Sequence, residues 1–144
     1  MTINEEICAS RNCGVVRCGL SLSSTTVPEL AREFGLRDDL SSYKEIDEET
    51  ARRLVRLILH QDMAYHSDVM PAARAAELAD RFLGQFAAGA RFFTNGNFYE
   101  ERKKISDSAW SGPSWNPVTE ATFDTGLLVL ATGWHGCLWI EDED

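Results

Sequence analysis

The sequence predicts an α+β fold in which N-terminal helices pack on a small, mostly antiparallel sheet. Between residues 47 and 89, apolar side chains recur at the three- and four-residue spacing of amphipathic helices. After Gly89 this spacing stops, and short apolar segments separated by turn residues follow instead. The last two segments, 122–131 and 136–140, are joined by a tight turn at 132–135 and predict a C-terminal β-hairpin.

A strand and a short helix are predicted in the first part of the chain. Residues 14–22 are a weak strand candidate, which the polar residues 23–26 end. Thr26 can cap a helix that has Pro28 and Glu29 in its first turn, because both residues favour helix starts. Gly35 is typical of a helix C-terminus, and we expect residues 38–43 to form a loop.

Two longer helices are predicted next. Asp47 is a good N-cap, and Ala51, Leu54, Val55 and Ile58 share one helical face. The following helix starts near Pro71 and is closed by Gly89. Its apolar face comprises Ala72, Ala75, Ala76, Ala79, Phe82, Leu83 and Phe86. Because the link 61–70 is short, the two helices are expected to form an antiparallel hairpin.

The segment after these helices carries the strongest turn signal. Residues 91–94 predict a strand, Asn95-Gly96 predicts a two-residue hairpin turn, and 97–99 would begin the returning strand. We interpret residues 101–116 as an ordered loop, because no segment apolar enough to form a second domain follows. The whole chain, 1–144, is therefore expected to be one globular domain.

The charge balance excludes some partners. With 23 acidic and 14 basic residues, the formal net charge is −9, which argues against binding nucleic acid or an anionic membrane. Two segments carry the excess: residues 29–49, with a net charge of −5, and residues 141–144, with −4. Clustered negative charge is common at helix starts and in solubilising tails, but it also steers basic partners.

We expect the protein to remain in the cytoplasm with free thiols. The longest apolar run, 127–131, is too short to span a membrane, and Glu5 and Glu6 stand where a signal peptide would be positive. Three of the four cysteines, Cys8, Cys13 and Cys18, recur every five residues, which is not the usual spacing of a zinc site. We expect no metal or cofactor, although this spacing leaves metal binding by the three cysteines open.

Catalysis is the alternative that the histidines raise. His60 and His66 flank the link between the two longer helices, with Asp62 and Asp68 nearby. The histidines are not at the four-residue spacing that places two imidazoles on one helix face. The sequence also contains no nucleophile elbow, dinucleotide fingerprint or phosphate loop. A small enzyme using these residues therefore remains an alternative without a supporting motif.

Aromatic residues favour a protein-binding function. All four tryptophans lie after residue 109, and Trp110 and Trp115 fall in the polar segment where exposure is expected. Tryptophan is enriched at interaction hot spots because it buries a large area at low entropic cost. The acidic residues 141–144 close the chain directly after Trp139-Ile140. An aromatic loop together with an acidic tail would suit a basic protein partner.

These features resemble the small cytoplasmic immunity proteins of bacterial toxin–immunity pairs. The resemblance is carried by the acidic single domain without an export signal, by the turn at 92–96, and by the closing segments 122–126 and 136–144. It implies a non-enzymatic, stoichiometric inhibitor that covers a toxin's active site or locks its fold. An adaptor or chaperone that holds a secreted effector before export is a second alternative.

The expected partner is a cognate toxin or effector that is basic, and the expected contacts are aromatic and acidic side chains. Aromatic rings would anchor in pockets, whereas carboxylates would pair with Arg or Lys and mainly set the association rate. The predicted contact residues are Trp110, Trp115, Glu141, Asp142, Glu143 and Asp144, with Asp38 and Asp39 as a second acidic patch.

Overall fold

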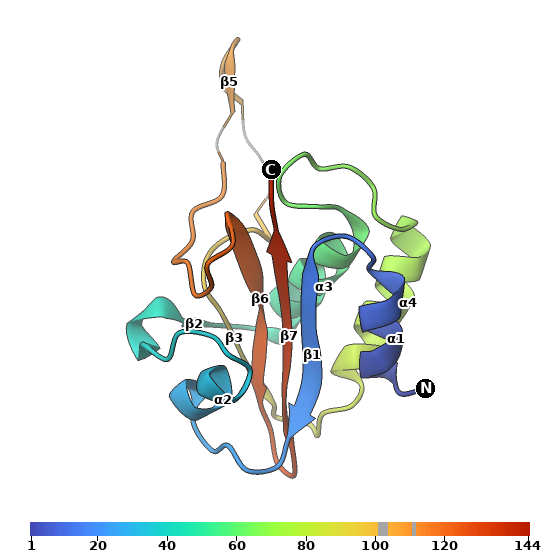
Figure 1. The fold of residues 1–144 in the computed structure, drawn as a ribbon, viewed down its shortest axis with the longest axis vertical. Coiled ribbons are helices and arrows are strands. Elements are labelled where there is room, and N and C mark those ends of the chain that lie inside the picture. The colour runs from blue at the N-terminus through green and yellow to red at the C-terminus, as the bar shows by residue number, and fades with distance from the viewer. Residues whose placement is uncertain (101–103, 111) are drawn as a thin grey trace.

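A five-stranded antiparallel sheet forms the centre of the molecule (Figure 1). The computed structural model describes residues 1–100, 104–110 and 112–144, with the backbone alone at 104, 105, 109 and 110. The sheet order is β1-β7-β6-β3-β2. Its strands are β1 (Val15–Ser21), β2 (Lys44–Ile46), β3 (Arg91–Thr94), β6 (Phe123–Leu130) and β7 (His135–Asp142). Two short strands, β4 (Lys104–Ser106) and β5 (Ala109–Trp110), pair separately and project from one end of the body (Figure 1).

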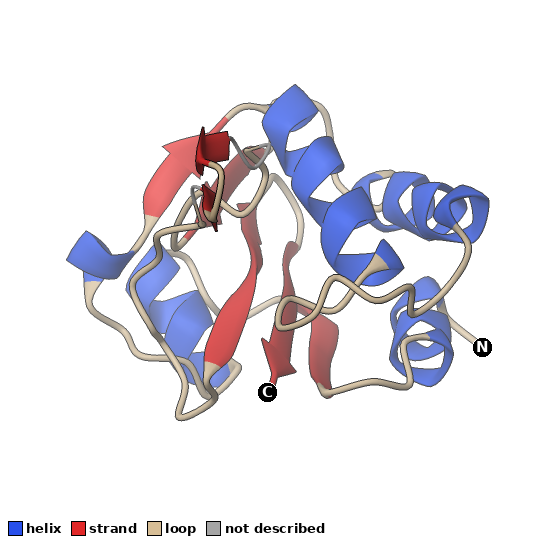
Figure 2. Cartoon of the chain, turned by 90° about the horizontal axis from the view of Figure 1, so that it is seen from above, coloured by secondary structure: helices blue, strands red, loops and turns tan. Residues whose placement is uncertain are grey.

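Helices cover both faces of the sheet (Figure 2). On one face lie α1 (Ile3–Ser10), α3 (Glu48–His60) and α4 (Ala72–Leu83), while α2 (Val27–Glu33) packs on the other. A single 3₁₀ turn, Leu40–Ser42, follows α2. The predicted α+β class is confirmed, with the helical hairpin α3–α4 and the C-terminal β-hairpin β6–β7.

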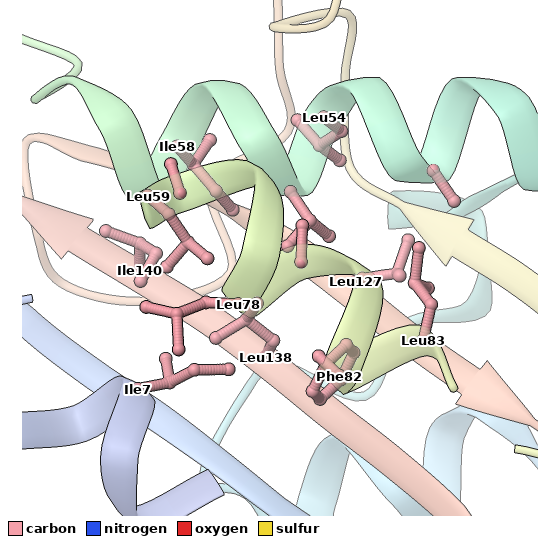
Figure 3. Packing of buried hydrophobic residues seen from close by; sticks show 14 of the residues in the cluster. Ile7, Leu54, Ile58, Leu59, Leu78, Phe82, Leu83, Leu127, Leu138 and Ile140 are labelled. Atoms are coloured by element: carbon pink, nitrogen blue, oxygen red, sulfur yellow. The ribbon is translucent and has the colours of Figure 1, made fainter. Parts of the chain in front are cut away.

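The alternation of side chains along the central strands creates two apolar cores. Successive residues of a strand point to opposite faces, so Leu127 and Leu138 contact α3 and α4, whereas Leu128 and Trp139 face α2. Figure 3 shows the larger core, where Phe82 and Ile58 of the helical hairpin lie over β6 and β7. Most of the predicted apolar helical faces are thus buried against the sheet, although Ala72 is exposed and Phe86 lies beyond the end of α4.

Local capping explains where the predicted helices begin. The Asp47 side chain accepts a hydrogen bond from the backbone N–H of Thr50 at 2.8 Å, and Thr26 does the same for Glu29 at 3.3 Å. After α2, Gly35 has a φ of +76°, a conformation that glycine adopts without steric cost. Both helix starts and the end of α2 are therefore confirmed.

Among the described residues, helix α1 and the strands β2, β4 and β5 were not predicted; β4 and β5 lie in the segment 101–116, which was interpreted as an ordered loop. Helix α1 is held by a capping box in which Thr2 and Glu5 exchange hydrogen bonds, but only Asn4 and Ile7 are buried, so no apolar period marks it. Strand β2 is a three-residue edge strand inside a stretch of mixed polarity. Short elements with few buried side chains leave little pattern in a sequence.

Two predicted boundaries were wrong. Helix α4 ends at Leu83 and is followed by Gly84, whereas Gly89 lies in the turn before β3. Asn95-Gly96 forms no hairpin: β3 pairs with β2 and β6, and Gly96 bridges to Trp115. The reason lies in the Asn95 side chain, which is buried and donates to Asp124 Oδ1 and to the carbonyl of Asn116, both at 2.9 Å. Asn95 therefore acts as a buried hydrogen-bond donor, and it does not form the tight turn that its residue type favours.

Candidate functional site

The end of the sheet where β7 finishes gathers most of the residues predicted to bind a partner. The chain terminus, the loop 61–70 and the projecting β4–β5 hairpin all lie at this end (Figure 1). Asp38 and Asp39 follow α2, which packs on the face of the sheet opposite α3 and α4. Asp38 is paired with Arg32 at 2.8 Å, and this hydrogen bond holds the pKa of Asp38 below its usual range.

The acidic segment 141–144 is a tail only in its second half, because Glu141 and Asp142 belong to β7. Glu141 accepts a hydrogen bond from Arg17 Nε at 2.8 Å on the neighbouring strand. Glu143 is exposed and accepts from the backbone N–H of Thr122 at 3.2 Å, while Asp144 is exposed at the chain end. Only Glu143 and Asp144 therefore present carboxylates to solvent as predicted.

Asp142 is buried and cannot contact a partner without local unfolding. Its oxygens meet Arg11 Nη1 at 3.0 Å and Nη2 at 2.9 Å, and the two side chains are 2% and 0% exposed. Arg11 Nε also donates to the carbonyl of Ile58 at 2.7 Å, and Asp142 accepts from the backbone of Met63 at 2.9 Å. This pair fastens α1, the end of α3 and the loop 61–70 to the last strand.

Of the two tryptophans predicted to be exposed, Trp115 is half-buried. Its ring lies 5.0 Å from that of Phe98 and stacks on Phe123 at 5.6 Å, centroid to centroid. The indole Nε1 is buried and has no hydrogen-bond partner within the described part of the chain. Trp110 lies in β5, and its side chain falls outside the described residues.

Of the two candidate catalytic histidines, His60 ends α3 and His66 lies in the loop 61–70, which uses its carboxylates for folding. Burial opposes ionisation of Asp62, yet backbone N–H groups, including those of Tyr65 at 2.6 Å and Ser67 at 3.0 Å, hold its pKa below the usual range. His60 Nδ1 lies 2.7 Å from the carbonyl of Met70, and its Nε2 is 3.5 Å from Asp68. His66 is exposed and is joined by no side-chain hydrogen bond to another residue that the structure describes.

A cavity of about 510 Å³ lies beside this loop and was not predicted. Its walls are the solvent side of α3, the loop at 61–66, the turn 97–100 and residues 112–113. Apolar side chains line much of it: Leu57, Ile58, Met63, Phe98 and Pro113. Arg53, His66, Tyr99 and Glu100 contribute polar groups. Residues so distant in sequence meet only in the folded chain, so no local pattern indicates the cavity.

Asp124 is a third buried carboxylate, after Asp142 and Asp62. It accepts hydrogen bonds from the backbone of Val118 at 3.2 Å, from Trp139 Nε1 at 3.2 Å and from Asn95. Burial raises its pKa, although these hydrogen bonds act in the opposite direction. The donors that surround it come from the fold itself, which gives Asp124 a structural role.

The four thiols are free and lie in different environments. Cys8 and Cys13 are exposed, Cys18 is half-buried, and Cys137 is buried in the core beneath α2. Over residues 1–100, 104–110 and 112–144, no three His, Cys, Asp or Glu side chains are grouped as metal ligands would be.

Comparison with known proteins gives no relative: no family model, no curated protein and no solved structure matches this chain. Within the described residues, no helix is both long and apolar enough to cross a membrane.

Proposed function

We propose that this protein acts as an immunity protein that neutralises a cognate, basic bacterial toxin by forming a stoichiometric complex. The observation that carries the proposal is the set of unpaired carboxylates at the end of the sheet, beside the projecting hairpin. Glu120 precedes β6, Glu143 and Asp144 follow β7, and all three are exposed without an ion-pair partner among the described residues.

Most arginines pair with other acidic side chains, and this leaves the carboxylates at the end of the sheet free to attract a partner. The arginines engaged in salt bridges with acidic side chains of the same chain are Arg11, Arg17, Arg32, Arg52, Arg56, Arg74, Arg81 and Arg91. The excess of acidic over basic residues therefore remains on the surface. Exposed charge of one sign accelerates capture of an oppositely charged partner and contributes less to the final affinity.

The test begins with a tagged pull-down from the source bacterium and identification of stoichiometric partners by mass spectrometry. A captured basic protein that is toxic when expressed alone and harmless with this chain supports the proposal. Capture of unfolded or N-terminal segments of an effector, but not of its folded domain, would favour the adaptor or chaperone alternative. Absence of any toxic partner that this chain neutralises would contradict the immunity function.

A triple variant then tests the surface itself. Glu120→Gln, Glu143→Gln and Asp144→Asn together should slow association with the captured toxin several-fold at low salt, with little effect at high salt. Glu49→Gln serves as a matched control, because Glu49 is exposed in the first turn of α3 and has no ion pair within the described part of the chain. If the control slowed association as much as the triple variant, the carboxylates at the end of the sheet would have no specific role in capturing the toxin.

The enzyme alternative ranks second, on the observation that His66 lines a cavity of ligand size. General acid–base catalysis usually requires a histidine oriented by a second polar group, and Asp62, the nearest candidate, already accepts hydrogen bonds from its own loop. Neutralisation that survives replacement of both His60 and His66 by alanine would dismiss this alternative.

A further inference from the structure

Arg53 is one of few cationic side chains in the described part of the molecule without a salt bridge. It is exposed on α3, one turn after the first-turn acid Glu49, and it lines the cavity of about 510 Å³. The neighbouring arginines Arg52 and Arg56 both pair with Asp80 of α4, at 2.7 and 3.1 Å. Arg52 and Arg56 therefore connect α3 to α4, whereas Arg53 lies beside the cavity.

The cavity beneath Arg53 has an apolar floor. Leu57 lies one turn further along α3, and the buried side chains of Ile58, Met63 and Phe98 complete the floor. Its volume falls within the range of small-molecule sites, which are mostly apolar with a few polar groups that fix the ligand's orientation. The apolar part of a ligand would be desolvated against this lining, while a charged group of the ligand could lie beside the exposed Arg53 side chain.

The other charged groups of the cavity are already engaged. Both oxygens of Asp62 accept backbone N–H groups of their own loop, and Glu100 accepts from Asn97 Nδ2 at 3.3 Å. Lys44 lies outside, with its Nζ 5.2 Å from the centre of the Tyr99 ring. Among the described residues that line the cavity, the guanidinium of Arg53 is thus the charged group without a hydrogen-bond partner, and its planar fork matches a carboxylate.

The wall opposite α3 is held in a fixed conformation. His66 has a φ of 58°, which is uncommon for a residue other than glycine. Its backbone N–H donates to the carbonyl of Asp62 at 3.2 Å, while the Asp62 side chain caps the residues on either side. Such conformations persist where surrounding contacts enforce them, and they are frequent at ligand sites.

We propose that this cavity binds a small amphipathic anion, with an aromatic or branched aliphatic body on the floor and a carboxylate paired with Arg53. Glu120, Glu143 and Asp144 of the proposed toxin-binding surface are not among the residues that line the cavity, and the proposal does not depend on that function. The ligand is of the size of one or two fused rings, because the cavity has a volume of about 510 Å³.

Two probes of nearly the same shape, one anionic and one neutral, test this site. The full chain is titrated with 1-naphthaleneacetate and with the neutral 1-naphthaleneacetamide, by calorimetry and by amide chemical shifts. The carboxylate should bind with a Kd of about 1 mM or tighter, as expected for a ligand of this size. The amide should bind about fivefold more weakly or worse, because it cannot form the charged pair. The largest shifts should fall on residues 53–66 and 97–100.

Two surface variants distinguish a specific pair between the ligand carboxylate and Arg53 from nonspecific electrostatic attraction to the protein. Arg53→Gln should abolish the preference for the carboxylate, whereas Arg37→Gln should preserve it. Arg37 is a matched control because it is also exposed and has no salt bridge among the described residues, yet it follows α2 on the other face. The proposal is overturned if the carboxylate binds more weakly than about 1 mM, if the amide binds as well as the carboxylate, or if Arg53→Gln leaves the preference intact.

Discussion

Arg11 and Asp142 lie 131 residues apart in the sequence and form a two-armed ion pair in the interior of the protein. The pair joins the end of the first helix to the end of the last strand. It also contacts the carbonyl of Ile58 and the backbone of Met63, so four segments depend on it. A buried pair adds little net stability over apolar residues of equal size, but the loss of one partner leaves an uncompensated charge.

The first prediction concerns this pair. Asp142→Asn should lower the free energy of unfolding by about 3–5 kcal/mol, because the Arg11 guanidinium would remain buried without a counter-charge. Urea unfolding measures the loss. The double variant Arg11→Met with Asp142→Leu should lose much less than the two single variants together. Additive losses would show that the charges are not coupled.

The contrast between Asp47 and Asp142 explains how far the sequence could predict the fold. Asp47 acts on Thr50, three residues away, so its capping role can be recognised from its neighbours. The same holds for Thr26, and for the alternation that buries Leu127 and Leu138. Asp142 acts on a residue at the other end of the chain, and in the sequence it is indistinguishable from Glu143.

The candidate site was less predictable for the same reason. Glu143 and Asp144 are exposed, as composition suggested, whereas Trp115 is packed between Phe98 and Phe123. The cavity depends on the approach of α3 to residues 97–100, which no local pattern encodes. The sequence does not show which arginines lack a salt bridge. Arg53 differs from Arg52 and Arg56 only because the fold places Asp80 beside the latter two.

The second prediction concerns the buried Nε1 of Trp115, which has no partner in the described part of the chain. Trp115→Phe removes this unsatisfied donor and keeps a ring against Phe98 and Phe123. The expected stability is within about 1 kcal/mol of the original, because the lost contact area is offset by the removed desolvation penalty. Trp115→Ala should cost about 3 kcal/mol, the low end for a buried tryptophan, since it removes the ring of a half-buried side chain. Thermal unfolding compares the two, and equal losses would refute the assignment.

The third prediction follows from Glu6, which ties α1 to α4. Hydrogen bonds from Arg81 at 2.8 Å and Arg74 at 2.6 Å lower the pKa of Glu6 from 4.5 to about 2. Because the folded pKa is depressed, the stability that these pairs contribute is present above pH 4.5 and is lost as the pH falls towards 2. The original chain should therefore exceed Glu6→Gln in stability at pH 7 and lose this advantage in strong acid.

Carboxyl NMR titration checks the cause. Arg81→Gln should raise the pKa of Glu6 towards its usual value by removing the larger of the two effects. Arg91→Gln is the control, because Arg91 pairs with Glu45 on the neighbouring β2 strand and should leave Glu6 unchanged. A Glu6 that titrates near 4.5 in the original chain would contradict the pairing.

The last prediction orders the reactivity of the thiols. Burial raises the pKa of Cys137 well above its usual value of 9.0, and it raises those of Cys18 and Cys8 as well. Since the thiolate is the reactive form, the exposed Cys13 should be alkylated first by iodoacetamide at pH 8, followed by Cys8. Cys18 should react slowly, and Cys137 should be protected until the protein unfolds. Peptide mass spectrometry follows each site over time, and labelling in urea shows whether all four thiols react once exposed. Rapid labelling of Cys137 in the native protein would contradict its burial beneath α2, because α2 would then have to detach from the sheet.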